Sequence, residues 1–324
     1  MRNESVPPSL AREGNLMVQA LVADLLETPG VKVTILRDRR ISWPENANGD
    51  ATKIVWVEER DDLKRMLREL MERSDAVWPI APETDGELEK FSESALRADK
   101  ILLNSPPKAV RTAASKLATT RFLEQRGVPV VSAHAFPQIP EHWQGPWVVK
   151  PDDGVGCEGS RILGNREELS QVLGAENRNG AIIQPYVKGD PVSISAIFHQ
   201  GRAQLLSCNR QRIAIIEQRF RLNGCQVNAI DAGNGNYRQI TEAVAAALPE
   251  LWGYAGIDLI ETDEGLRVLE INPRLTTSYA GLRRATGINP AAYVLNLVHK
   301  GRLPHPLKPA RRVVEINLES FRVG

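Results

Sequence analysis

The stretch GIDLIETDEGLRVLEINPR, residues 256–274, alternates apolar and polar positions on both sides of a turn. Alternation with a period of two predicts β-strands, and two such runs joined by a short Gly-containing turn predict a hairpin. With Asp263-Glu264-Gly265 as a three-residue loop and Gly265 left-handed, Thr262 pairs with Leu266. The stretch therefore predicts an antiparallel hairpin whose register follows from its loop.

Three oxygen-bearing side chains share one face of this hairpin. In the predicted register Asp258 lies directly opposite Glu270, and Asn272 follows on the same face. Two carboxylates and an amide suit Mg²⁺, which prefers carboxylate and phosphate oxygens. Without a cation the facing carboxylates would repel each other unless both reached solvent, and the flanking Leu, Ile and Val residues oppose a solvated face. We therefore predict that these three residues bind metal.

A glycine-rich segment, residues 154–159 (GVGCEG), lies between two predicted strands. It fits GxGxxG, but a dinucleotide-binding fingerprint requires a helix that begins inside the glycines, and here residues 160–163 continue as a strand. Strand, glycine loop and strand can form a flap whose backbone N–H groups cover phosphates. An ordinary flexible hairpin is the alternative interpretation.

Basic side chains accompany these two elements. Lys150 ends the strand 147–150 just before the flap, so a cation lies next to whatever the flap covers. Lys116 lies in the first turn of a predicted helix, and Arg274 directly follows the hairpin. A further arginine cluster contains one acid, Glu217, and favours small anions over nucleic acid: Arg202, Arg210, Arg212, Arg219 and Arg221.

Composition excludes several classes of protein. In 324 residues, 41 Lys and Arg face 40 Asp and Glu, so the net charge of +1 recruits neither nucleic acid nor an anionic membrane. No apolar run approaches the roughly 20 residues that span a bilayer, and the polar start Met1–Glu4 lacks the apolar core of a secretory signal. Three cysteines without CxxC spacing and five histidines without HxxH spacing indicate neither a disulfide framework nor a zinc site. We expect a cytoplasmic protein.

The predicted elements change in character along the chain. Residues 1–105 are predicted to form an α/β domain with one partly parallel sheet, from helices 16–28 and 60–73 and strands 31–36, 53–57 and 76–80. A helix from about 108 to 126 follows and ends at Gly127. Beyond Trp147 the pattern is α+β, with strands 147–150, 160–163, 181–184, 192–198, 203–207, 255–261, 266–272 and 313–318, and helices near 165–173, 237–248 and 287–299.

Together these elements resemble the ATP-grasp superfamily of carboxylate-amine ligases. The resemblance runs from about residue 116 to 296 and rests on five elements in order: the Lys116 helix, the strand 148–151, the glycine flap, the hinge 183–190, and the hairpin residues with Arg274. It implies an ATP-grasp fold in three parts: an N-terminal α/β (pre-ATP-grasp) domain at 1–105, a small lobe at 106–187 and a large lobe at 188–324.

The resemblance also implies which residues act. Gln184 stands where the family usually has Glu, yet its amide oxygen can still accept from the adenine amino group. Asp258, Glu270 and Asn272 would hold two Mg²⁺ ions, which Mn²⁺ could replace, while Arg274 and Lys150 would act in catalysis. The residues implied to bind ATP, with Asp190 at the ribose hydroxyls, are Lys116, Lys150, Gly154, Gly156, Gly159, Ser160, Gln184, Tyr186, Val187 and Asp190.

Three shorter motifs indicate which group within the superfamily the chain resembles. Residues 10–14 (LAREG), 80–85 (IAPETD) and Asn104-Ser105 look like the tyramine-glutamate ligases of methanofuran biosynthesis, or a bacterial relative serving methylofuran. This implies small-molecule substrates, with L-glutamate as the carboxylate and a tyramine- or tyrosine-like amine. The residues implied to contact them are Glu83 and Asp85 at the amine, with Tyr279 as its apolar wall, and Arg210 and Arg212 at the substrate carboxylates.

Three alternatives stay open on the sequence. An ATP-grasp dipeptide ligase of other specificity would use the same arginines. A nucleotide-binding regulatory module without turnover need not keep the metal-binding set or Arg274. A phosphotransferase to a hydroxyl is disfavoured, because no HRD or DFG motif is present. The sequence determines neither the two substrates nor the oligomeric state.

Overall fold

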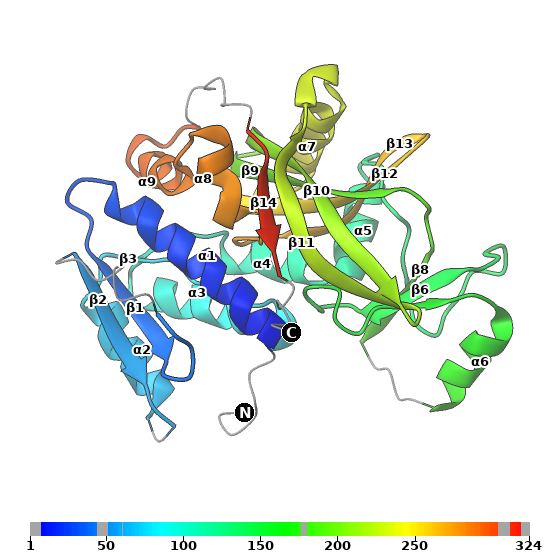
Figure 1. Cartoon of the computed structure of the whole chain (residues 1–324), viewed down its shortest axis with the longest axis horizontal. Coiled ribbons are helices and arrows are strands. Elements are labelled where there is room, and N and C mark those ends of the chain that lie inside the picture. Colours follow the sequence, from blue (N-terminus) through cyan, green and yellow to red (C-terminus); the bar gives the residue numbers. More distant parts are fainter. Residues whose placement is uncertain (1–7, 44–50, 60, 176–179, 304–311, 319–324) are drawn as a thin grey trace, which may run out of the picture.

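The computed structural model describes residues 8–43, 51–59, 61–175, 180–303 and 312–318; the polar start Met1–Glu4 lies outside them. Its N-terminal part (left in Figure 1) holds two small sheets, each of two parallel strands. The prediction of one partly parallel sheet is wrong in this respect, because the two pairs do not join. The pairs are β1 (Val33–Asp38) with β2 (Thr52–Val57), and β3 (Ala76–Val77) with β4 (Ile101–Leu102).

Helix α1 links this part to the C-terminal end of the chain (Figure 1). It spans Pro8–Leu26 and so begins before the predicted residue 16. Met17 and Leu21 of α1 belong to one apolar cluster with Leu282 of α8 (Tyr279–Thr286), and α9 (Pro290–Lys300) contributes to the same cluster. Burial of this shared face fixes the position of α1 against the main body. The other N-terminal helices are α2 (Leu63–Glu72) and α3 (Glu87–Arg97).

The predicted helix 108–126 is two helices, α4 (Pro107–Ala114) and α5 (Lys116–Glu124). Ser115 between them is extended, with φ −86° and ψ 110°, and its hydroxyl oxygen accepts from the Ala118 N–H. Asp152 stabilises the break, since it accepts from the Ser115 hydroxyl at 2.6 Å and from the Leu117 N–H at 2.8 Å. Lys116 is therefore the first residue of a capped helix, and the prediction of one continuous helix is wrong at Ser115.

A ten-stranded sheet forms the rest of the molecule, in the order β13-β12-β9-β10-β11-β7-β6-β8-β5, with β14 paired to β11. Its neighbouring strands are antiparallel, and α6 (Arg166–Ala175) and α7 (Asn236–Ala247) flank it. The strands are β5 (His134–Ala135), β6 (Trp147–Pro151), β7 (Arg161–Leu163), β8 (Ala181–Pro185), β9 (Asp190–His199), β10 (Arg202–Ile216), β11 (Arg219–Ile230), β12 (Gly253–Thr262), β13 (Gly265–Asn272) and β14 (Val314–Asn317).

In the hairpin β12–β13, Asp258 lies opposite Glu270 as predicted, but the loop that joins the two strands differs from the predicted one. Thr262 pairs with Gly265, not with Leu266, so the loop has two residues instead of three. That register alone would place Asp258 opposite Leu269. A bulge between the Asp258 and Leu259 pairs adds one residue to β13, and Asp258 again lies opposite Glu270. The predicted loop is wrong, while the predicted face is correct.

Gly224 of β11 provides a test of the close pairing between β11 and β14. Its φ of +140° favours glycine, and a Cβ there would lie 1.9 Å from the carbonyl oxygen of Ile316 in β14. Gly224→Ala should lower the free energy of unfolding by about 2 kcal/mol or more, because the clash separates β11 from β14. The control is Gly14→Ala in α1, where a Cβ meets nothing within 4 Å and alanine favours the helix by about 1 kcal/mol. Equal unfolding free energies in urea would contradict this account.

Candidate active site

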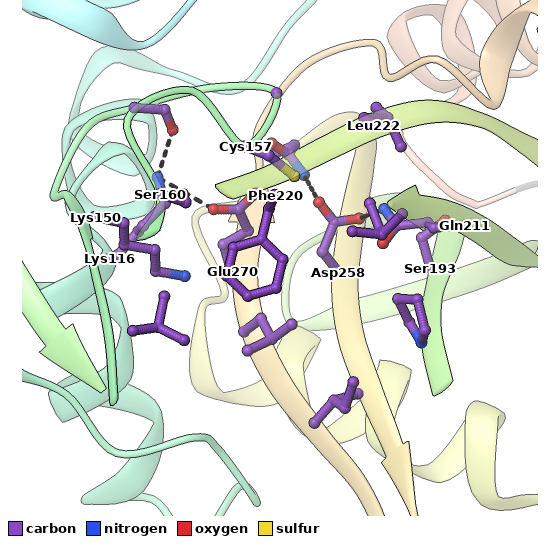
Figure 2. A pocket seen from close by; sticks show the side chains of 18 of the residues that line it. Lys116, Lys150, Cys157, Ser160, Ser193, Gln211, Phe220, Leu222, Asp258 and Glu270 are labelled. Carbon is purple, nitrogen blue, oxygen red and sulfur yellow. Dashed lines mark hydrogen bonds and ion pairs between the residues drawn. The ribbon is translucent and has the colours of Figure 1, made fainter. Parts of the chain in front are cut away.

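One cavity of about 350 Å³ lies where the flap, β6, β8, β10–β11, the hairpin β12–β13 and α1 meet (Figure 2). Sequence separations among these elements reach more than 200 residues, so the fold alone assembles the site. Most residues that the sequence singles out line this cavity: Lys116, Lys150, Gly154, Gly156, Ser160, Gln184, Tyr186, Val187, Asp258, Glu270, Asn272 and Arg274.

The predicted metal-binding residues form one hydrogen-bonded group. Asn272 donates its Nδ2 hydrogen to Asp258 Oδ2 at 3.0 Å, and Gln211 of β10 donates from Nε2 to Asp258 Oδ1 at 2.8 Å. Figure 2 shows Glu270 between Asp258 on one side and Lys116 and Lys150 on the other. Sequence reasoning did not find Gln211, whose only signal is its place in the arginine-rich stretch.

Burial and neighbouring charges shift the pKa values of the two carboxyl groups in opposite directions. Burial raises the pKa of Asp258 well above its ordinary value, and the neighbouring Glu270 carboxylate raises it further. Burial also acts to raise the pKa of Glu270, but Lys116 and Lys150 outweigh it, so that pKa is lowered. The two facing acids thus carry a charge repulsion that a cation would relieve.

This donor set fits Mg²⁺, which takes few protein carboxylates and completes its shell with water and phosphate oxygens. The described residues contain no group of three or more His, Cys, Asp or Glu placed to hold a metal. The set formed by Asp258, Glu270 and Asn272 has two carboxylates and one amide. It is therefore suited to an ion that a phosphate ligand helps to hold, and not to a closed structural site.

The two lysines lie beside Glu270 in a largely enclosed setting. Lys116 Nζ lies 3.1 Å from Glu270 Oε2 and donates to the carbonyl oxygen of Gly154 at 2.5 Å. A cation in the first turn of a helix opposes the helix dipole, so Lys116 needs these oxygen partners. Burial lowers the pKa of Lys150, and Glu270 opposes that shift. Such ammonium groups are placed to neutralise phosphate.

The hinge strand and a long hairpin enclose the other end of the cavity. Gln184 donates from Nε2 to the carbonyl oxygen of Val131 at 2.8 Å, which fixes the orientation of its amide. Tyr186 lies 6.5 Å from Phe220 between ring centroids. Apolar residues of β10 and β11 complete a wall that suits a flat ring, and sequence reasoning did not find them: Ile213, Ile215, Phe220 and Leu222.

The glycine flap has the predicted strand–loop–strand form, with β6 paired to β7. Gly156 and Gly159 have φ of +61° and +70°, and a Cβ on Gly159 would lie 2.9 Å from Pro151. Gly159 lines a neighbouring cavity rather than the main one. Burial raises the pKa of Cys157 to about 12, so its thiol stays protonated.

Four predicted contact residues lie elsewhere. Arg210 pairs with Asp190 at 2.7 Å, and Arg212 contacts Asn317 and Glu315. The predicted contact residues Asp190, Arg210 and Arg212 do not line the cavity. The reason is the period of two along β10: Gln211, Ile213 and Ile215 face the cavity, so Arg210 and Arg212 face away. Tyr279 is buried and donates to Asp24 at 3.0 Å, so it forms no wall of the cavity.

The two acids from residues 80–85 also differ in position from the prediction. Glu83 is buried and accepts from Arg274 Nε at 2.8 Å, and Arg274 itself lines the cavity. Asp85 lies in the short helix η2 (Thr84–Gly86), and its backbone N–H donates to Asp153. Glu83 therefore orients Arg274 and Asp85 contacts the flap base, while neither lines the cavity.

Comparison with known proteins identifies the family. The model described as "ATP-grasp domain" matches residues 113–278, which is more than half of the chain, and that described as "pre ATP-grasp 3 domain" matches residues 31–110. The chain belongs to the ATP-grasp family. The predicted ATP-grasp fold with a pre-ATP-grasp domain is thereby confirmed.

Individual relatives agree with this family. The chain is 26% identical over 279 residues to tyramine–L-glutamate ligase of Methanocaldococcus fervens, covering 85% of this chain and 84% of the relative. It is 27% identical over 213 residues to tetrahydromethanopterin:alpha-L-glutamate ligase of Methanocaldococcus jannaschii, covering 60% and 69%. A crystal structure of an ATP-grasp superfamily protein from Archaeoglobus fulgidus superposes with a TM-score of 0.68 at 22% identity, covering 98% and 96%.

These findings confirm the predicted resemblance and enzyme class, an ATP-dependent carboxylate-amine ligase. The family acts on ATP with Mg²⁺, as expected. The boundaries at residues 105 and 187 and the roles of individual site residues stay predictions. No helix in the described part of the chain is long and apolar enough to cross a membrane.

The flap can be tested without any second substrate. Adding Mg-ATP should slow amide hydrogen exchange at residues 152–160, because their N–H groups would then donate to phosphate oxygens. Exchange in β1 and β2, outside the cavity, is the internal control and should not change. Unchanged exchange at the flap with saturating Mg-ATP would show that it does not cover the nucleotide.

Proposed function

We propose that this protein uses Mg-ATP to activate the carboxylate of L-glutamate and joins it to a tyramine- or tyrosine-like amine. The observation that carries the proposal is the half-buried pair Asp258 and Glu270, which lines the same cavity as two lysines. This arrangement concentrates groups that bind a metal–triphosphate complex. The relatives supply the substrate classes.

The reaction balances in two steps. A carboxylate oxygen of glutamate attacks the γ-phosphorus, the bond to the bridging oxygen breaks, and ADP leaves from an acylphosphate. The ammonium form of the amine first loses one proton to water, and the nitrogen lone pair then forms a bond to the acyl carbon. The bond from that carbon to the phosphate oxygen breaks with its electron pair, the nitrogen gives its second proton to the leaving phosphate, and the products are an amide and inorganic phosphate.

The residues of the cavity suit these steps through electrostatics. Lys116, Lys150 and the flap N–H groups would bind the phosphates, with Arg274 at the transferring phosphoryl group. Asp258, Glu270 and Asn272 would hold two Mg²⁺ ions, which Mn²⁺ could replace. Bound Mg²⁺ neutralises phosphate charge and orients the phosphoryl group for attack. Glu83 acts through Arg274, because its carboxylate fixes that guanidinium.

Glutamate is better supported than any particular amine. The names of both curated relatives contain glutamate, whereas their partner substrates differ, one being tyramine and the other tetrahydromethanopterin. The tyramine ligase matches along more of this chain, which favours tyramine or a related amine. The same match to a tyramine ligase leads us to propose that the reaction belongs to biosynthesis of a methanofuran- or methylofuran-type cofactor.

Removal of the Glu270 carboxylate tests whether the predicted metal-binding set is needed for amide formation. Glu270→Gln should lower amide formation by roughly 100-fold or more, the loss expected when one group that stabilises the transition state is removed. Glu264→Gln is the matched control, since it lies in the same hairpin with a side chain that is 77% exposed. Initial rates and melting temperatures are measured together. Wild-type rates in a folded Glu270→Gln protein would remove the pair from the mechanism.

A panel of amines tests the substrates. Purified protein with ATP, Mg²⁺ and L-glutamate should release phosphate when tyramine or tyrosine is added, and mass spectrometry should find the amide. Aliphatic amino acids that react while tyramine and tyrosine do not would replace this assignment by a dipeptide ligase. Mg-ATP binding without phosphate release for any amine would support a regulatory module instead.

A further inference from the structure

A carboxylate that the mechanism above does not use lines the cavity. Glu13 lies in α1 and reaches the site from the N-terminal part of the molecule. Its Oε1 accepts a hydrogen bond from the Thr277 hydroxyl, in the segment that follows Arg274. Its Oε2 points toward the flap, because a Cβ placed on Gly156 would lie 3.8 Å from that atom. Glu13 therefore lies between the flap and the Arg274 segment.

The position of Glu13 is fixed by packing. One side of α1 is buried against α8 and α9, with Met17 and Leu21 among the buried residues. Asp24, further along α1, accepts from Tyr279 at 3.0 Å and lies 3.4 Å from Arg283. The helix is thus held along its length, and Glu13 near its start is carried on a rigid element.

Glu13 makes no direct ion pair within the described part of the chain. Arg274 attracts it electrostatically, but the Nε of Arg274 already pairs with Glu83, which is 5% exposed. Lys116 pairs with Glu270. Among the described residues Glu13 has no ion-pair partner within 4.0 Å. A half-buried carboxylate without a direct ion pair repels phosphate and the carboxylates of glutamate, and it attracts a cation.

The second substrate of the proposed reaction supplies such a cation. A primary aliphatic amine titrates near lysine, with a pKa of about 10.4, and so arrives as an ammonium ion at neutral pH. We propose that Glu13 is the residue that binds this ammonium group and thereby selects a cationic amine. The inference rests on the proposed function and assigns the amine end of the same cavity to Glu13, in place of Glu83 and Asp85.

Hydroxylamine separates amine binding from the chemistry. It is mostly neutral at pH 7 and can trap an acylphosphate as a hydroxamate without any cation site. Glu13→Gln should therefore form glutamyl hydroxamate from ATP, glutamate and hydroxylamine at close to the wild-type rate. With tyramine, its KM should rise about 10- to 100-fold, the range for a lost charged hydrogen bond.

Glutamine at position 13 can still accept from Thr277, so a merely structural role would be preserved in this variant. The matched control is Glu27→Gln, just beyond the end of α1, where the native carboxylate pairs with Arg283 outside the cavity. It should behave as wild type with both nucleophiles. Melting temperatures of both variants report any loss of folding.

Each outcome has a distinct meaning. If Glu13→Gln lowers the hydroxamate and tyramine rates equally, Glu13 serves phosphoryl transfer, holds a metal ion or binds the α-ammonium group of glutamate, and the inference is wrong. An unchanged KM for tyramine also overturns it. If the wild-type protein forms no hydroxamate, the proposed function itself fails. Wild-type hydroxamate formation with a selective loss for tyramine supports both.

Discussion

The half-buried carboxylate pair formed by Asp258 and Glu270 is the constraint on which the rest of the site depends. Two acids held opposite each other in a low-dielectric cavity are stable only with nearby positive charge. Lys116 and Lys150 supply part of it, while burial and, after it, the neighbouring Glu270 carboxylate raise the pKa of Asp258. In the proposed function, bound metal ions would supply the remaining positive charge.

The helix α5, the flap and Glu13 are arranged around this carboxylate pair. Asp152 caps α5, whose first residue Lys116 pairs with Glu270, and the same Asp152 begins the flap that lines the cavity. Positive groups gather near the carboxylate pair, whereas Glu13, which makes no direct ion pair among the described residues, comes from the N-terminal helix α1. On the function proposed above, one region of the cavity would bind phosphate and another a cation.

Sequence reasoning succeeded where neighbouring residues decide the outcome. The strand period places Asp258, Glu270 and Asn272 together, and this survives an incorrect loop because a bulge at Leu269 restores the register. Sequence reasoning failed at Ser115, where the helical pattern of residues 108–126 continues although the helix breaks and a new one begins. Ser115 is compatible with a helix interior, and only the distant Asp152 makes it a break.

The sequence by itself determined the hairpin, the flap and the lysine beside it, because these depend on periodicity and on glycine conformation within a few residues. Tertiary structure alone decided which arginines reach the cavity, since the face that β10 presents depends on its partners in the sheet. It also brought Glu13 to Thr277 across 264 positions of chain. No local pattern encodes such a contact, because it results from the packing of α1 against α8 and α9.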